Sequence, residues 1–282
     1  MQYMLHPETR DVIVEGREDA RFFSNFLMGV EALRDTEYHV YAVGDRVDLP
    51  PSIVFDAGFE DGRRGRVLTL ATIAVSWEEV VRRCLTCIAD ADRAFVRDDL
   101  PKSDVLLVTD FGSLECYALT PKVLSKFVLI YLGRDDPKGE ALMAALIPRL
   151  IAAFLARAAL HLADVGYGVT DEQLKRHRFD DPESDRSLIT RSLPDGKQGQ
   201  ALNAKVAPVL AQLRREVPAD EPRKAIRGHD IAILLVNHLG LRNEQAHHNV
   251  VEAGLMACVE RSDLENYPLF HALVERLASI HD

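Results

Sequence analysis

Residues 86–95 read TCIADADRAF, and this stretch decides the predicted fold. Its first half, Thr86 to Ala89, is an apolar run of the kind that forms a buried strand. Asp90 and Asp92 follow at once, separated by a single residue. Because residues two apart in an extended chain point to the same side, we expect the two carboxylates to face one way.

Two further apolar runs also end in acidic residues. Residues 11–14 precede Glu15, and residues 105–108 are followed by Asp110. Strands that alternate with helices predict a parallel α/β sheet, in which the carboxyl ends of the strands carry the functional site. We therefore expect the acids to gather at one edge of the sheet: Glu15, Asp90, Asp92, and Asp110 or Glu115.

Carboxylates at such an edge repel one another unless a cation lies between them. Mg²⁺ takes oxygen ligands, uses one or two carboxylates and keeps water molecules for substrate phosphates. The pattern therefore predicts a Mg²⁺ or Mn²⁺ site. Its predicted ligands are Glu15, Asp90, Asp92 and Asp110. The alternative is that Asp-x-Asp is a solvated turn and that Glu15 is a charge favoured at the start of a helix.

The N-terminal part continues with alternating strand and helix patterns. Phenylalanines at helical spacing follow the first apolar run, and strand-like runs cover residues 38–43 and 66–75. A segment rich in Gly, Pro and Asp, residues 45–65, predicts a loop between these runs. Ser76 with Glu79 three residues later predicts a capping box at the start of a helix.

Helical patterns dominate after about residue 120. Thr120-Pro121 predicts a helix start with proline at the first position. Long helical patterns then cover residues 137–165, 200–216, 222–239 and 246–280. Residues 175–200 are polar and predict a loop. We place an α/β domain at residues 1–125 and a mainly helical domain at residues 126–282.

The formal net charge of −10 limits the function classes. A protein that binds nucleic acid unaided usually carries a surplus of basic residues. If nucleic acid is the substrate, we expect either a local basic patch or a second subunit that supplies the positive field.

The cysteines and the apolar stretches indicate the cellular compartment of the protein. Cys84-x-x-Cys87 lacks a second ligand pair at zinc-site spacing, so all four cysteines are expected to be buried thiols. The longest apolar stretch, residues 141–163, is interrupted by Pro148 and by two arginines, so it predicts a core helix and not a membrane span. The N-terminus has no signal-peptide pattern, and we expect a cytoplasmic protein without a membrane partner.

The order of the acidic motifs resembles that of the TOPRIM fold. More narrowly, it is similar to the TOPRIM-like, AriB-type effectors of the PARIS anti-phage defence system, whose partner is an ABC-type ATPase. Within about the first 130 residues, the resemblance is carried by IVEGREDARFF at 13–23, IADAD at 88–92 and VTDFGSLECY at 108–117. RGHDIAILL at 227–235 resembles a later segment of the family.

This resemblance implies a mostly parallel sheet flanked by helices, followed by a mainly helical region, and a role for each matching acid. Glu15 matches the general acid/base glutamate, Asp90 and Asp92 match the metal ligands, and Glu115 and Asp110 match an additional acidic motif. Some TOPRIM nucleases also use a late basic residue that stabilises charge on the phosphate. The candidates here are Lys224, Arg227 and His229.

The resemblance also implies the function of a toxic effector in abortive infection. The expected activity is Mg²⁺-dependent hydrolysis of phosphodiester bonds, in RNA such as tRNA rather than in DNA. The expected partners are the nucleic acid substrate, the ABC-type ATPase and a second copy of the chain in an active homodimer.

Three alternatives stay open on the sequence. A haloacid-dehalogenase-type phosphatase prefers Thr or Val where this chain has Ala94, two residues after the second aspartate. A sugar-nucleotide transferase also uses Asp-x-Asp. A non-catalytic TOPRIM-like scaffold, or a metal-binding module that docks on an ATPase, would carry the same acids without cleaving a substrate.

Overall fold

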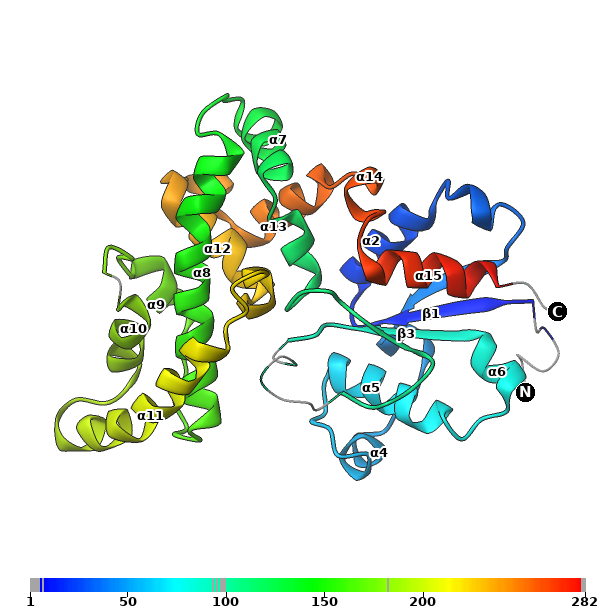
Figure 1. Cartoon of the computed structure of the whole chain (residues 1–282), viewed down its shortest axis with the longest axis horizontal. Helices are drawn as coiled ribbons and strands as arrows, with labels where there is room; N and C mark the ends of the chain where they lie inside the picture. The colour runs from blue at the N-terminus through cyan, green and yellow to red at the C-terminus, as the bar shows by residue number, and fades with distance from the viewer. Residues whose placement is uncertain are drawn as a thin grey trace. The chain divides into compact units, whose positions relative to one another are not determined.

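The chain forms two compact units in a computed structural model that describes residues 6, 8–92, 94, 96, 100–181 and 183–279 (Figure 1). The sheet unit comprises residues 1–91, 99–110 and 261–282. The helical unit comprises residues 92–98 and 111–260. Arg93 and Phe95, which follow the Asp-x-Asp motif, lie outside the described residues.

The sheet unit is built on four parallel strands in the order β2-β1-β3-β4. They are β1 (Arg10–Val14), β2 (Tyr38–Ala42), β3 (Leu85–Ala89) and β4 (Leu106–Val108). All residues of the central strands β1 and β3 are buried, and Ile13 of β1 pairs with Cys87 of β3. The predicted α/β fold with a parallel sheet followed by helices is confirmed.

Successive side chains of the central strands point to opposite faces of this sheet. Ile13 and Cys87 belong to an apolar cluster that includes α5 (Arg63–Ala74). The opposite face is covered by α2 (Arg17–Leu27) and α15 (Pro268–Ala278), as Figure 1 shows. The rings of Phe26 and Phe270 join these two helices, with centroids 4.6 Å apart in an edge-to-face arrangement.

The C-terminal helix α15 belongs to the sheet unit, so the compact units do not follow the predicted boundary at residue 125. Leu269, Phe270, Leu273 and Leu277 form a buried apolar face at helical spacing. Arg276 on the same helix donates hydrogen bonds to Thr86 Oγ1 at 3.0 Å and to the backbone carbonyls of Arg82, Leu85 and Asp104. The helical unit is therefore inserted in sequence between β4 and the last helices.

Two predictions for the region after β2 are wrong. Residues 66–75 were expected as a strand but form most of α5, because the buried positions Val67, Leu68, Ala71 and Ala74 have helical spacing. The predicted loop at residues 45–65 contains the end of α3 (Val43–Arg46) and all of α4 (Pro51–Asp56).

Local capping explains where the next helices begin. Ser76 does not cap a helix: its hydroxyl donates to the Ile73 carbonyl, and α6 (Glu79–Arg83) begins after Glu78. Thr120 confirms its prediction, because its hydroxyl accepts from the Val123 N–H at 3.2 Å at the start of α7 (Pro121–Leu132).

The polar segment at residues 175–200 was predicted as a loop, but it contains α10 (Ser184–Ser192). Asp185 on this helix accepts two hydrogen bonds from Arg214, and Leu188 and Ile189 are buried. A short apolar face and one ion pair therefore order a segment whose overall composition is polar.

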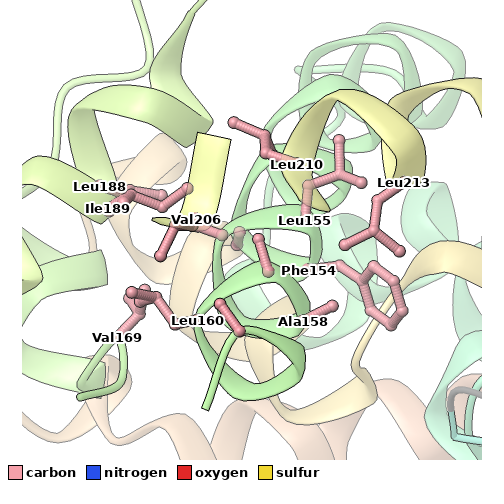
Figure 2. Packing of buried hydrophobic residues seen from close by; sticks show 14 of the residues in the cluster. Phe154, Leu155, Ala158, Leu160, Val169, Leu188, Ile189, Val206, Leu210 and Leu213 are labelled. Atoms are coloured by element: carbon pink, nitrogen blue, oxygen red, sulfur yellow. The ribbon is translucent and has the colours of Figure 1, made fainter. Parts of the chain in front are cut away.

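The helical unit is organised around α8 (Gly139–Leu162), which packs against α7, α10, α11 (Gly196–Glu216) and α12 (Gly228–Leu239). Figure 2 shows part of its buried core: Phe154, Leu155, Ala158, Leu160, Val169, Leu188, Ile189, Val206, Leu210 and Leu213. The other helical elements of this unit are η2 (Leu114–Ala118), α9 (Asp171–Arg176), η3 (Pro222–Ala225), η4 (Asn243–Ala246) and α13 (His248–Cys258), while η1 (Glu31–Leu33) and α14 (Arg261–Leu264) belong to the sheet unit.

Among the described helices, α8 is the one that is long and apolar enough to cross a membrane. Of its 18-residue apolar stretch, 44% is buried. Its residues Leu142, Leu146 and Leu150 are fully buried, so the helix supplies core to the helical unit. The four cysteines are buried, and burial raises the pKa of Cys87 to about 12.

Replacing the Arg276 side chain should destabilise the sheet unit. Arg276→Met keeps an apolar stem but removes the donors to three carbonyls and one hydroxyl. Since a hydrogen bond to a charged group contributes about 1.5–3 kcal/mol and these bonds share one side chain, we expect a loss of about 2–4 kcal/mol in the free energy of unfolding. Urea unfolding measures this loss.

The matched control is Arg215→Met, because Arg215 is exposed on α11. That variant should unfold within about 0.5 kcal/mol of the wild type. Equal stability of the two variants would contradict an anchoring role for Arg276.

Candidate functional site

Glu15 and Asp90 lie side by side at the carboxyl ends of the two central strands. Strand β1 ends at Val14 and β3 ends at Ala89, so each acid directly follows its strand. The backbone N–H of Asp90 donates a hydrogen bond to Glu15 Oε1 at 3.0 Å. Both residues are half-buried, so this contact fixes a carboxylate at a partly solvated edge of the sheet. Their role as metal ligands stays a prediction.

Residues after β4 form hydrogen bonds at the same edge of the sheet. The Thr109 hydroxyl accepts a hydrogen bond from the Ala91 N–H at 2.9 Å. Asp110 Oδ2 accepts from the Leu269 N–H at 3.4 Å, in the first turn of α15. A carboxylate is favoured there by the positive end of the helix dipole, so Asp110 has a structural role at the start of α15.

Two arginines from the first turn of α5 lie close to the ends of β1 and β3. Arg64 Nε donates to the Asp90 carbonyl at 3.2 Å. Arg63 Nη1 lies against Gly16, 3.3 Å from the point where a Cβ of that residue would be. The sequence analysis did not single out these arginines, because it assigned residues 45–65 to a loop and 66–75 to a strand. We call Glu15, Asp90 and Arg64 the acidic edge.

Asp92 belongs to the helical unit and does not continue an extended strand. Its φ of 47° is left-handed, and its N–H donates to the Gly112 carbonyl at 2.8 Å. Asp92 therefore departs from the extended geometry on which the expectation that Asp90 and Asp92 face the same side depends. Asp92 lines a pocket of about 300 Å³ together with Gly112, Ser113, Phe154, Arg157, Ala158, His161, Ile226 and Arg227.

The predicted phosphate-binding candidates occupy different environments in the helical unit. Lys224 is exposed on η3. Arg227 forms an ion pair with the buried Asp230, with 3.3 Å between Nη1 and Oδ1, and Arg157 contacts the same carboxylate. The positive charge that Arg227 and Arg157 bring to the pocket is thus balanced in part by Asp230. His229 forms a hydrogen bond with the carboxylate of Glu252.

His229 lies in a cluster with Glu115 and Glu252 that could hold a metal ion. One potential ligand atom from each residue lies within 4.8 Å of the other two. His229 Nδ1 donates to Glu252 Oε2 at 2.8 Å, and this hydrogen bond raises the pKa of His229. Burial raises the pKa of the Glu115 carboxyl. The residues come from α12, η2 and α13, and no sequence motif marked Glu252.

Close backbone packing positions Glu115. A Cβ at Gly228 would overlap Glu115 Oε2 and the Ser113 hydroxyl, so any other residue at the start of α12 would displace these side chains. The sequence analysis named Glu115 and His229 for separate roles, and the structure brings them together.

The sequence matches no protein-family model, and a search of the curated proteins finds no significant match. The TOPRIM resemblance therefore rests on the order of the motifs and stays a prediction.

A methyl group at position 228 should disturb the cluster of Glu115, His229 and Glu252. Within a helix, Gly→Ala usually stabilises a protein by about 0.4–1 kcal/mol. At Gly228 the added methyl group overlaps a carboxylate and a hydroxyl, so we expect Gly228→Ala to destabilise the chain by about 1–3 kcal/mol. Thermal unfolding without metal measures the effect.

Gly44→Ala is the matched control, since Gly44 lies in α3 and a Cβ there would meet nothing within 4 Å. We expect the control to be neutral or stabilising. A Gly228→Ala variant as stable as the control would show that Glu115 does not need the space.

Proposed function

We propose that the chain is a metal-dependent nuclease of TOPRIM-like fold whose active site is the acidic edge. The observation that carries the proposal is the hydrogen bond from the Asp90 N–H to Glu15 Oε1. It joins two acids at the carboxyl ends of neighbouring parallel strands, the position where ligands bind in open α/β sheets.

The donor set at this edge suits a hard divalent cation. Glu15 and Asp90 offer carboxylate oxygens, which Mg²⁺ and Mn²⁺ prefer. When bound, such a metal ion supplies positive charge that polarises a phosphoryl oxygen. The resemblance adds Asp92 to the ligands, and the variants below test that residue separately.

Glu15 is proposed to move the proton of the attacking water or of the leaving oxygen. The hydrogen bond from the Asp90 N–H fixes the orientation of the Glu15 carboxylate, and a general acid/base needs such a fixed orientation. Arg64 is proposed to hold a phosphate oxygen near this carboxylate, because a guanidinium carries several donors in a planar fork. Arg64 thus joins Lys224, Arg227 and His229 as a candidate for the charge-stabilising residue.

The proposed substrate is RNA such as tRNA, and the proposed role is that of a toxic effector in anti-phage defence. The net charge of −10 supports action within a larger assembly, because phosphate binding depends on a positive field. An ABC-type ATPase is the proposed partner, and a homodimer is the proposed active form. These assignments follow from the motif resemblance.

Substitutions of Glu15, Asp90 and Asp92 should lower the cleavage rate without unfolding the chain. We expect Glu15→Gln to lower the rate about 10²–10⁴-fold, the usual loss for a general acid/base. Asp90→Asn and Asp92→Asn should also lower it, and part of their activity should return at higher Mg²⁺ or with Mn²⁺. The assay measures cleavage of tRNA and of plasmid DNA against metal concentration, with and without an ABC-type ATPase partner.

Asp35→Asn is the matched control, because Asp35 is exposed in the turn before β2. It should cleave at the wild-type rate, and circular dichroism should report the same fold for all variants. If folded Glu15→Gln and Asp90→Asn cleave as fast as the control, the acidic edge is not the active site and a non-catalytic scaffold takes its place.

A further inference from the structure

We propose that Glu115, His229 and Glu252 form a metal site in the helical unit that takes a first-row transition-metal ion such as Zn²⁺. The inference concerns residues other than the acidic edge and does not rest on the proposed nuclease activity. It combines the geometry of the three side chains, the packing that holds them and the chemistry of their donor atoms.

The distances suit one shared ion. Zinc lies about 2.0–2.2 Å from imidazole nitrogen and from carboxylate oxygen, so two ligand atoms of a tetrahedral site lie about 3.3–3.6 Å apart. His229 Nδ1 and Glu252 Oε2 are 2.8 Å apart, and one potential ligand atom from each of the three residues lies within 4.8 Å of the other two. Small side-chain rotations would therefore let an ion replace the hydrogen bond between His229 and Glu252.

The fold supplies these side chains from elements that are distant in the sequence. Glu115 lies on η2, His229 in the first turn of α12 and Glu252 on α13. Gly228 lets the backbone of α12 approach the Glu115 carboxylate closely. A bound ion would connect the three elements and so stabilise the helical unit.

Burial gives a reason for a cation at this position. Burial raises the pKa of Glu115, and the negative charge of Glu252 acts in the same direction. A divalent ion would offset both effects by compensating the two carboxylates. Across the cluster, the half-buried Glu115 and Glu252 lie next to the exposed His229, so the ion can enter from solvent.

The donor atoms select the class of metal. Imidazole suits Zn²⁺ and other late first-row ions, whereas Mg²⁺, Ca²⁺ and Mn²⁺ prefer oxygen ligands. Three protein ligands also leave a coordination position for water or for an oxygen of a substrate, as in open zinc sites. The cluster therefore differs in metal preference from the all-oxygen acidic edge.

The test is isothermal titration of the metal-stripped full chain with Zn²⁺, in a Glu15→Gln, Asp90→Asn background that removes the acidic edge. We expect one Zn²⁺ per chain. Adding Glu252→Gln or His229→Ala should weaken binding about 100-fold or more, because loss of even a supporting hydrogen bond costs about 10–100-fold. Zn²⁺ should raise the melting temperature of the background protein and not that of these variants.

Glu244→Gln is the matched control, since Glu244 is exposed in η4 on the same unit. It should bind Zn²⁺ like the background protein. Glu252→Gln preserves side-chain volume, so melting temperatures without metal check its folding. Absence of Zn²⁺ binding, unchanged binding in Glu252→Gln and His229→Ala, or equal affinity for Mg²⁺ would overturn the proposal. None of these outcomes bears on cleavage at the acidic edge.

Discussion

The hydrogen bond between the Asp90 N–H and the Glu15 carboxylate joins segments 75 residues apart, and the acidic edge depends on it. It exists only because β1 and β3 are parallel neighbours in a fixed register, with Ile13 opposite Cys87. A shift of one residue would turn the buried side chains of a strand to the other face, so the apolar faces fix the register. The same packing that builds the core thus positions the polar edge.

The sheet unit is completed by a part of the chain that follows the helical unit in sequence. Asp110 accepts a hydrogen bond at the beginning of α15, and Arg276 near its end donates to carbonyls beside β3 and β4. The helix therefore fastens the strand that carries Asp90. This connection makes the integrity of the acidic edge depend on residues close to the C-terminus.

Much of the sheet could be predicted from the sequence, whereas several helices could not. Short apolar runs bounded by acids identified β1, β3 and β4. Residues 66–75 are also apolar and rich in β-branched residues, and periodicity alone does not separate a buried helix from a buried strand in such a run. The apolar face of α15 was visible in sequence, but its pattern does not say which surface it covers.

The residues of the candidate sites also differ in whether the sequence predicts their positions. Glu15 and Asp90 were predictable because each directly follows a strand, while Arg64 and Glu252 reach their places only through tertiary packing. The central claim is that the acidic edge binds a divalent metal ion. Anomalous diffraction from crystals grown with Mn²⁺ tests it most directly. The account predicts a peak between the carboxylates of Glu15 and Asp90, and crystals that hold Mn²⁺ elsewhere with no peak at this edge would contradict it.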